Sequence, residues 1–365
     1  MPTTVPTATG PQVFNTLLIS GKESASAYGV AVGANLTMGS IVTDIPTAIF
    51  HWVTEPNFQA RALRHIADEG FRGVAGQMFD LIPGPGEGTI GFGGMVYLDA
   101  FPHIMNNMLG YDVVTTPATV TYMHTMTAAP TPLSYTYRWA QGIKAYEFTG
   151  GRLSNLRLSF NAADGALTYS TQGMSKLGTS MGTNPLDNYW YPTDARLAQG
   201  PAVGGWQGLM TIDGQTAGTT GYASVLEGEL TLSRQLTPIH SLNGTQDLSQ
   251  IYPGPLQVEG RLTLDWYDKT YYEYFSGTGI TLPGALSKPI TLKFTQVAGG
   301  SFGAGERSMA ITITKAGFRQ VDIERSGAIY TQVLNFVGEY NLSDTGPAKA
   351  VFMNGVSAAY GLTPS

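Results

Sequence analysis

The feature that most constrains the fold is a short arrangement that occurs twice along the chain. Each copy has a Pro-Gly-Pro triplet, then a strand-like run that ends in aspartate, then a stretch with apolar residues at helical spacing. The first copy runs from Pro83 through Asp99, and the second runs from Pro253 through Asp265. The first copy is four residues longer between proline and aspartate, and inserted glycines at 86–94 explain this difference. The repeated order predicts a duplicated chain.

Three helices are expected from apolar spacing. The first covers 101–109, with Gly110 ending it as the C′ residue. The second is indicated by the spacing of Tyr267, Tyr271, Tyr272 and Phe275, with Asp268 as its N-cap and Gly277 closing it. A third is expected after Pro56. Its apolar face would hold Phe58, Ala62, Leu63 and Ile66.

The remainder of the chain is expected to be strands. Residues 156–160 alternate apolar and polar side chains, and a turn at 161–165 then leads to Leu167 and Tyr169, which predicts a hairpin. Leu230 and Leu232 indicate another half-buried strand. Residues 135–139 resemble 310–314, and each is followed by a turn that contains lysine. The composition agrees, because 46 glycines, 21 prolines and 13% charged residues favour turns and sheets over helical bundles.

These patterns predict an α+β, mainly β fold with two tandem domains, 1–199 and 200–365, each an antiparallel sheet with one helix. Residues 178–221 are rich in Gly, Thr, Asn and Pro, so they are expected to form the inter-domain loop.

Several classes of protein are excluded. The net charge of −6 argues against tight nucleic-acid binding, and the absence of cysteine excludes disulfides, thiolate-bound zinc and a cysteine nucleophile. The N-terminal residues lack the basic and apolar regions of a signal peptide, and no apolar run is long enough to span a bilayer. A soluble protein made in a cytoplasm is expected.

No motif supports catalysis, so we expect no enzyme, no cofactor and no metal. Residues 86–91 have dinucleotide-binding spacing, but prolines precede them and a strand follows, which favours a flexible loop. Residues 299–303 match a nucleophile elbow, but no histidine follows His240. The five histidines lack metal-ligand spacing, and the carboxylate pairs Asp68-Glu69 and Glu227-Glu229 fit a solvated face better than a glycosidase site. The aromatic residues at 266–275 are interpreted as core and subunit interface.

Taken together, the chain resembles the tail tube (major tail) proteins of bacteriophages with long, non-contractile tails. The resemblance rests on a Gly-Lys-Glu segment that begins at Gly21, on residues 68–73, on the Gly-rich strand up to Asp99, and on the helix up to Gly110. Residues 226–236, the second Pro-Gly-Pro triplet and the Tyr-rich helix repeat that order. The resemblance covers most of residues 15–345.

The resemblance implies two tail-tube-like β-sandwich or barrel domains, each with a flanking helix, whose sheets join around a ring. Because the chain is duplicated, three copies would close a ring with pseudo-sixfold symmetry. The rings would stack into a tail tube in the virion, assembled in the host cytoplasm, around a tape-measure protein and between tail-terminator and tail-tip proteins. Genomic DNA would pass through the lumen without specific binding, and no membrane is involved.

Ring stacking is expected to use the N-terminal arm, residues 178–221 and two loops. The loop residues are Pro83, Gly84, Pro85, Gly86, Glu87, Gly88, Pro253, Gly254 and Pro255. A capsid decoration protein or a carbohydrate-binding β-module of a virion is the alternative.

Overall fold

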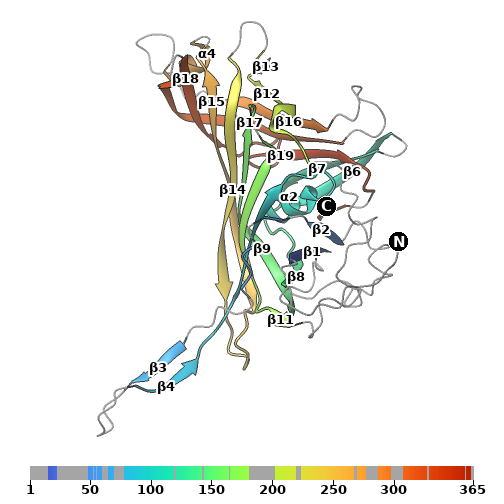
Figure 1. Ribbon diagram of the computed structural model, residues 1–365, viewed down its shortest axis with the longest axis vertical. Helices are drawn as coiled ribbons and strands as arrows, with labels where there is room; N and C mark the ends of the chain where they lie inside the picture. Colours follow the sequence, from blue (N-terminus) through green and yellow to red (C-terminus); the bar gives the residue numbers. More distant parts are fainter. Residues whose placement is uncertain are drawn as a thin grey trace, which may run out of the picture.

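In this computed structural model, antiparallel strands make up most of the described chain and join into one sheet of 17 strands and a separate sheet of two strands (Figure 1). The structure describes the following residues: 15–22, 48–51, 53–54, 56–59, 65–69, 78–118, 121–141, 144–163, 165–180, 202–218, 223–266, 269–276, 287–296, 307–326, 329–357 and 359–362.

The elements of the first half are β1 (Asn15–Lys22), β2 (Ala48–His51), β3 (His65–Glu69), β4 (Met78–Pro83), β5 (Gly88–Met95), α2 (Phe101–Leu109), β6 (Gly110–Ala118), β7 (Thr121–Ala128), β8 (Tyr135–Gln141), β9 (Lys144–Asn161), β10 (Thr168–Ser175) and β11 (Thr179–Ser180). Those of the second half are η1 (Gly205–Gln207), β12 (Gly208–Ile212), β13 (Gln215–Thr216), β14 (Val225–Ile239), β15 (Gln250–Asp265), α4 (Thr270–Ser276), β16 (Ser287–Gln296), β17 (Arg307–Ser326), β18 (Ile329–Gly338) and β19 (Lys349–Asn354).

The two halves have the same order of strands. In the first half, neighbouring strands follow the order β2-β1-β8-β9-β10-β5. Residues 54–59 then lie along the free side of β5, through the bridges Thr54–Gly93 and Gln59–Thr89. In the second half the order is β13-β12-β16-β17-β18-β15-β14. Residues 54–59 therefore hold the position in the first half that β14 holds in the second.

Two β-bulges also occur at matching positions. Where β8 pairs with β9, the register shifts between Tyr135 and Tyr137, and where β16 pairs with β17 it shifts between Lys288 and Ile290. Further along, Ser154 of β9 and Arg319 of β17 are the extra residues of a second bulge against β10 and β18. Matching these bulges aligns β9 with β17 residue by residue. Leu158 then corresponds to Ile323.

The halves form one continuous sheet because strands pair across them. β14 pairs with β9, and β19 pairs with β7 of the β6–β7 hairpin, which follows α2. All nine residues of α2 are buried in the core. The helix begins after Ala100 with Pro102 in its first turn, and it ends at Gly110, whose φ of 106° suits glycine.

Several sequence predictions are confirmed. The helix at 101–109 with its terminal glycine, the β9–β10 hairpin and the strands at 230–232 and 310–314 are present. The Tyr-rich helix is present as α4, while Asp268 and Gly277 lie outside the described residues. A mainly β fold is also confirmed, and α4 and α2 lie in opposite halves of the chain.

The helix expected after Pro56 is wrong. Residues 56–59 are extended along β5, with Asn57 N–H donating to Gly91 O at 2.6 Å, and Ile66 lies in β3. The apolar spacing misled because Phe58 faces the core from an extended segment, while Ile66 is exposed on a hairpin. Residues 60–64 lie outside the described part of the chain.

The predicted Pro-Gly-Pro loops are corrected in part: residues 84–87 do form a link without regular secondary structure, whereas the rest of the first loop and all of the second lie in strands. Residues 88–94 belong to β5, which is flanked on both sides by hydrogen-bonded neighbours, and Pro253, Gly254 and Pro255 lie within β15. Met95 and Asp265 occupy equivalent positions opposite Thr168 and Thr331, so Pro83 corresponds to Pro253 without any insertion. The apparent four-residue insertion arose because the sequence comparison aligned Asp99, instead of Met95, with Asp265.

Two smaller predictions are wrong as well. Residues 314–317 continue β17 and do not form a turn. The expected inter-domain loop contains η1, β12 and β13 between residues 205 and 216, and residues 181–201 lie outside the described part.

Candidate functional site: the polar face of the central sheet

One face of the sheet is apolar and the opposite face is polar where β9, β14 and β15 lie side by side. Leu158, Leu230 and Leu262 are buried beneath the sheet. Between them, Ser159, Glu229 and Arg261 are directly opposite one another on the three strands and point to the other face. The period of two in each strand produces this separation.

The polar face continues across β18 to β17. Its charged residues are the carboxylates Glu227, Glu229, Glu259, Asp322 and Glu324 and the guanidinium groups of Arg157, Arg261 and, at the bulge of β17, Arg319. Most of the other positions are Ser, Thr, Asn or Gln. Five carboxylates against three guanidinium groups make this face acidic.

Short interactions hold several of these side chains in place. Arg157 Nη2 lies 2.5 Å from Glu229 Oε2, and Arg319, at the bulge of β17, lies 3.3 Å from Glu259 Oε1. Thr263 Oγ1 donates to Glu227 Oε1 at 3.3 Å. These groups are largely exposed, so the ion pairs organise the face more than they stabilise the fold.

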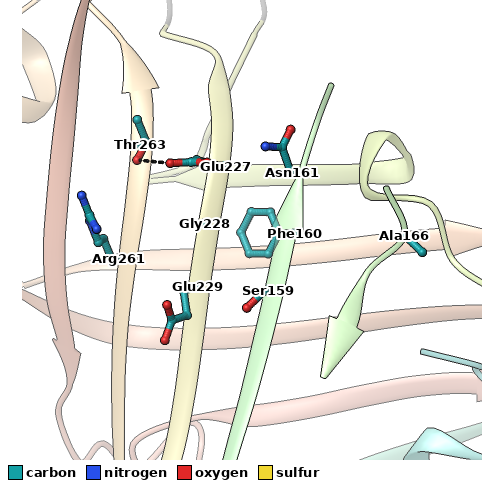
Figure 2. Close-up of a pocket in the computed structure, with 9 residues that line it drawn as sticks. All are labelled: Ser159, Phe160, Asn161, Ala166, Glu227, Gly228, Glu229, Arg261 and Thr263. Atoms are coloured by element: carbon teal, nitrogen blue, oxygen red, sulfur yellow. Dashed lines mark hydrogen bonds between the residues drawn. The ribbon is translucent and has the colours of Figure 1, made fainter. Parts of the chain in front are cut away.

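A hollow of about 290 Å³ lies where β9, β14 and β15 run side by side, and Figure 2 shows the residues that line it. It is lined by Ser159, Phe160, Asn161, Ala166, Glu227, Gly228, Glu229, Arg261 and Thr263. Gly228 cannot carry a side chain, because a Cβ atom would lie 2.5 Å from the Phe160 ring. The hollow is open, and its carboxylates are engaged by Thr263 and Arg157.

The arrangement offers no catalytic chemistry within the described residues. No group of three His, Asp or Glu side chains there is placed to hold a metal ion. No described helix is long and apolar enough to cross a membrane. Asp68 lies in β3, away from the pair Glu227 and Glu229 in β14.

The described histidines and aromatic residues differ in burial. His124 is fully buried and lies 2.9 Å from Asp112 Oδ2. His103 is buried in α2, whereas His65 and His240 are exposed. Tyr271 is buried in the core.

Arg234 of β14 is the buried charge that connects the two halves. Its guanidinium group donates to Met108 O and Ala129 O of the first half, at 2.9 Å each, and to Gly254 O at 3.0 Å. Met108 is near the C-terminus of α2, where a cation is favoured. Burial, with a smaller contribution from Arg152, lowers the pKa of Arg234 to about 10.

The predicted stacking residues lie at two equivalent places. Pro83 ends β4, the link from Gly84 to Glu87 follows, and Gly88 begins β5. Gly86 N–H donates to Gln246 O at 2.9 Å, so this link packs against the turn between β14 and β15. Pro253, Gly254 and Pro255 lie at the irregular pairing of β15 with β14.

Sequence reasoning placed Glu227 and Glu229 on a solvated face but did not identify the extent of the polar face. The signal was present in the alternation of Glu227, Glu229, Thr231 and Ser233 with Leu230 and Leu232. Sequence alone could not show that five strands from both halves align their polar positions.

Comparison with known protein families gives a match. The sequence profile of a family described as phage tail tube protein matches residues 12–331, which is most of the chain. No curated protein matches the sequence.

Proposed function

This chain belongs to the phage tail tube protein family and is a structural component of the virion tail, and we propose from that premise that three copies close into one ring of a long, non-contractile tail. It is not an enzyme. The match leaves the capsid-decoration and carbohydrate-binding alternatives without support. The observation that carries the proposal is the strand order shared by the two halves.

The shared order supports two tube domains in one chain, with a boundary near residues 199 and 200. The first unit would end after β11 at Ser180, and the second would begin before β12 at Gly208. Seven segments in the same order, with two bulges at matching positions, are difficult to obtain without duplication. Three chains would then supply six units to a ring.

We assign the polar face to the lumen of the tube. The acidic excess on β14, β15 and β17 would repel the phosphates of DNA, so the genome could slide without being bound. The paired charges Arg157–Glu229 and Arg319–Glu259 would keep the wall smooth and hydrated. The apolar face would pack against α2 and the outer strands.

We assign ring stacking to two arms that correspond between the halves. The first arm is the antiparallel pair β3 and β4, residues 65–69 and 78–83, and the second is the distal part of β14 and β15, residues 236–253. Figure 1 shows β3 and β4 extending away from the large sheet. Apolar side chains are exposed on both arms: Ile66, Leu81, Ile82, Ile239, Leu242 and Tyr252. Pro83 and Pro253 lie at the bases of the two arms, so the predicted stacking residues adjoin this surface.

The partners follow from the position of such a ring in a tail. Rings would assemble around a tape-measure protein, between tail-tip and tail-terminator proteins, before the tube conducts genomic DNA. Assembly would take place in the host cytoplasm.

Electron microscopy of the concentrated protein, with light-scattering mass alongside, tests the proposal. Hollow tubes or stacked rings with three chains per ring are the expected result, with a tail-tip complex added as initiator if the protein alone stays monomeric. Six chains per ring would overturn the trimer. A closed oligomer that never stacks, even with the initiator, would overturn the tube arrangement.

A further inference from the structure

The joint between the two halves of one chain provides a template for the joint between chains. β14 pairs with β15 of its own half and, on its other side, with residues 155–161 of β9. Leu158 of β9 and Leu230 of β14 are directly opposite each other and are 0% and 4% exposed. The second half, which contributes β14, is thus joined to the first half, which contributes β9, by backbone pairing and by buried leucines.

The second half has the edge that corresponds to residues 155–161. Matching the bulges places it at residues 320–326 of β17. β18 pairs with one side of this segment. On the other side, β16 begins at Ser287, opposite Gly317, and does not pair with residues 320–326. Among the described residues, no strand continues beyond β16 along that side. Ile323, the equivalent of Leu158, shares the face of the buried Val321 but is 45% exposed.

The first half has the strand that corresponds to β14. Residues 54–59 bond to β5 on one side, and Gln59 and Thr89 exchange both backbone hydrogen bonds at 3.3 Å. No described strand lies on their other side. Phe58, the equivalent of Leu230, faces the core and stacks on Trp139 with ring centroids 5.3 Å apart.

We propose that residues 54–59 of one copy add to residues 320–326 of β17 in the next copy as an antiparallel strand. The register follows from the β14–β9 joint, in which Glu227 is opposite Asn161 and Thr231 is opposite Arg157. Transferred to these two edges, it places Thr54 opposite Ser326 and Gln59 opposite Asp322. The first segment has one extra residue between these two pairs, as it also has against β5, where Thr54 and Gln59 are opposite Gly93 and Thr89. Phe58 then covers Ile323, as Leu230 covers Leu158.

The occupant of the β17 edge is a second copy of this chain, because the chain carries both complementary edges and the described residues show no strand pairing between them. Such a head-to-tail contact closes into a ring when the rotation per unit allows it. This inference rests on the proposed ring. It goes further by naming the strands and the register of the chain-to-chain joint.

A disulfide test reports this register directly, because the chain contains no cysteine. Gln59 bonds β5 through both backbone groups, so it would face Asp322 in a non-hydrogen-bonded pair, with Cα atoms about 4.5 Å apart. In assembled rings the double variant Gln59→Cys with Asp322→Cys should form covalent dimers and trimers on oxidation.

Two control variants make the result specific. Thr231→Cys with Arg157→Cys copies the same pair at the joint within the chain, and it should oxidise without any increase in mass. Thr54→Cys with Asp322→Cys shifts the register by several residues, and it should stay unlinked. If tubes form but the 59–322 pair stays monomeric, or if the shifted pair links instead, the joint is overturned while the tube function stands. Failure of the wild-type chain to form tubes, even with an initiator, would count against the proposed function itself.

A second variant tests the edge without cysteine chemistry. Ile323→Lys places a charge on the exposed edge, where it should prevent strand addition. We expect a folded monomer with wild-type circular dichroism and loss of ring-sized species. Leu342→Lys, at an 83% exposed position in the turn before β19, is the matched control and should assemble normally. Normal ring formation by Ile323→Lys would overturn the joint.

Discussion

The helix of the first half is enclosed, whereas the helix of the second half lies at one end of the sheet (Figure 1). All nine residues of α2 are buried, and the helix contacts β6, β7, β9, β14 and β19. α4 packs mainly against β17 and inserts Tyr271 into the core. The β6–β7 hairpin follows α2 and contacts it, which accounts for much of the difference in burial between the two helices.

Polar contacts fix α2 in place as well. Asn107 accepts a hydrogen bond from Leu153 N–H at 2.9 Å and donates to Gly151 O at 3.2 Å. It thereby bonds backbone groups of β9 between its two bulges. The comparison teaches that one strand order can surround two different helix environments, because α2 is enclosed by strands from both halves.

The largest effect is expected from removing residues 86–94. The deletion eliminates most of β5, which lies between β10 and residues 54–59, so the chain should lose its cooperative thermal transition. Leu242→Ser, at the exposed turn between β14 and β15, should leave Tm unchanged. Calorimetry of both proteins tests this, and a cooperative transition in the deletion variant would contradict the central position of β5.

Truncation in the two helices sharpens the comparison. Ile104 in α2 is 0% exposed, and Ile104→Ala should lower the free energy of unfolding by about 3 kcal/mol through lost burial and a cavity. Tyr272 in α4 is only partly buried, so Tyr272→Ala should cost about 1 kcal/mol. Urea unfolding measures both values, and equal losses would show that the helices are equivalent after all.

Two arginines where β14 meets the first half should differ in how much they stabilise the fold, because one is buried and the other is half-exposed. Arg234→Met leaves three buried or partly buried carbonyl groups without their donor and should cost about 2–3 kcal/mol. Arg157→Met removes a half-exposed ion pair and should cost less than about 1 kcal/mol. Both are read from urea midpoints. A larger loss of unfolding free energy in Arg157→Met than in Arg234→Met would show that the ion pair on the polar face stabilises the fold more than the buried hydrogen bonds.

The smallest effect concerns two carboxylates with opposite pH dependence. Burial raises the pKa of Asp99 although Arg307 partly offsets it, whereas the hydrogen bond from Lys315 lowers the pKa of Glu339. The unfolded chain therefore loses the Asp99 proton first as pH rises above about 4, and the stabilising contribution of Asp99 falls. Glu339 stabilises the fold above its ordinary value of 4.5, and this contribution is lost as pH falls through its lower folded pKa.

Thermal melts of Asp99→Asn and Glu339→Gln between pH 3 and pH 7 measure these slopes. The difference in Tm between wild type and Asp99→Asn should decrease with rising pH, and that for Glu339→Gln should increase. If the two Tm differences changed with pH in the same direction, the two carboxylates would not lie in opposite environments.

The sequence predicted the local elements better than their pairing. Phe101, Ile104 and Met108 define α2 because a buried helix imposes a period that the residues must follow. The strand pattern at 156–160 likewise predicted the β9–β10 hairpin, whose turn is local.

Long-range pairing was not predictable in the same way. The glycines of β5 suggested a loop because glycine lowers strand propensity, but Gly93 has Tyr169 O only 2.7 Å from where its Cβ would lie. That close neighbour comes from β10, far along the chain. The polar face also depends on the relative register of distant strands, which no local pattern records.

The matching bulges have a consequence for the calibre of a tube. A bulge bends its strand and increases the local twist. In the proposed ring, each unit would bend at the same two backbone positions, so the curvature of the wall would be set by the backbone bulges. Substitutions at Arg157, Glu229 or Glu259 would then alter the charge of the proposed lumen and are expected to leave its width unchanged. Insertion or loss of a residue at Ser154 or Arg319 would make alternate units bend unequally.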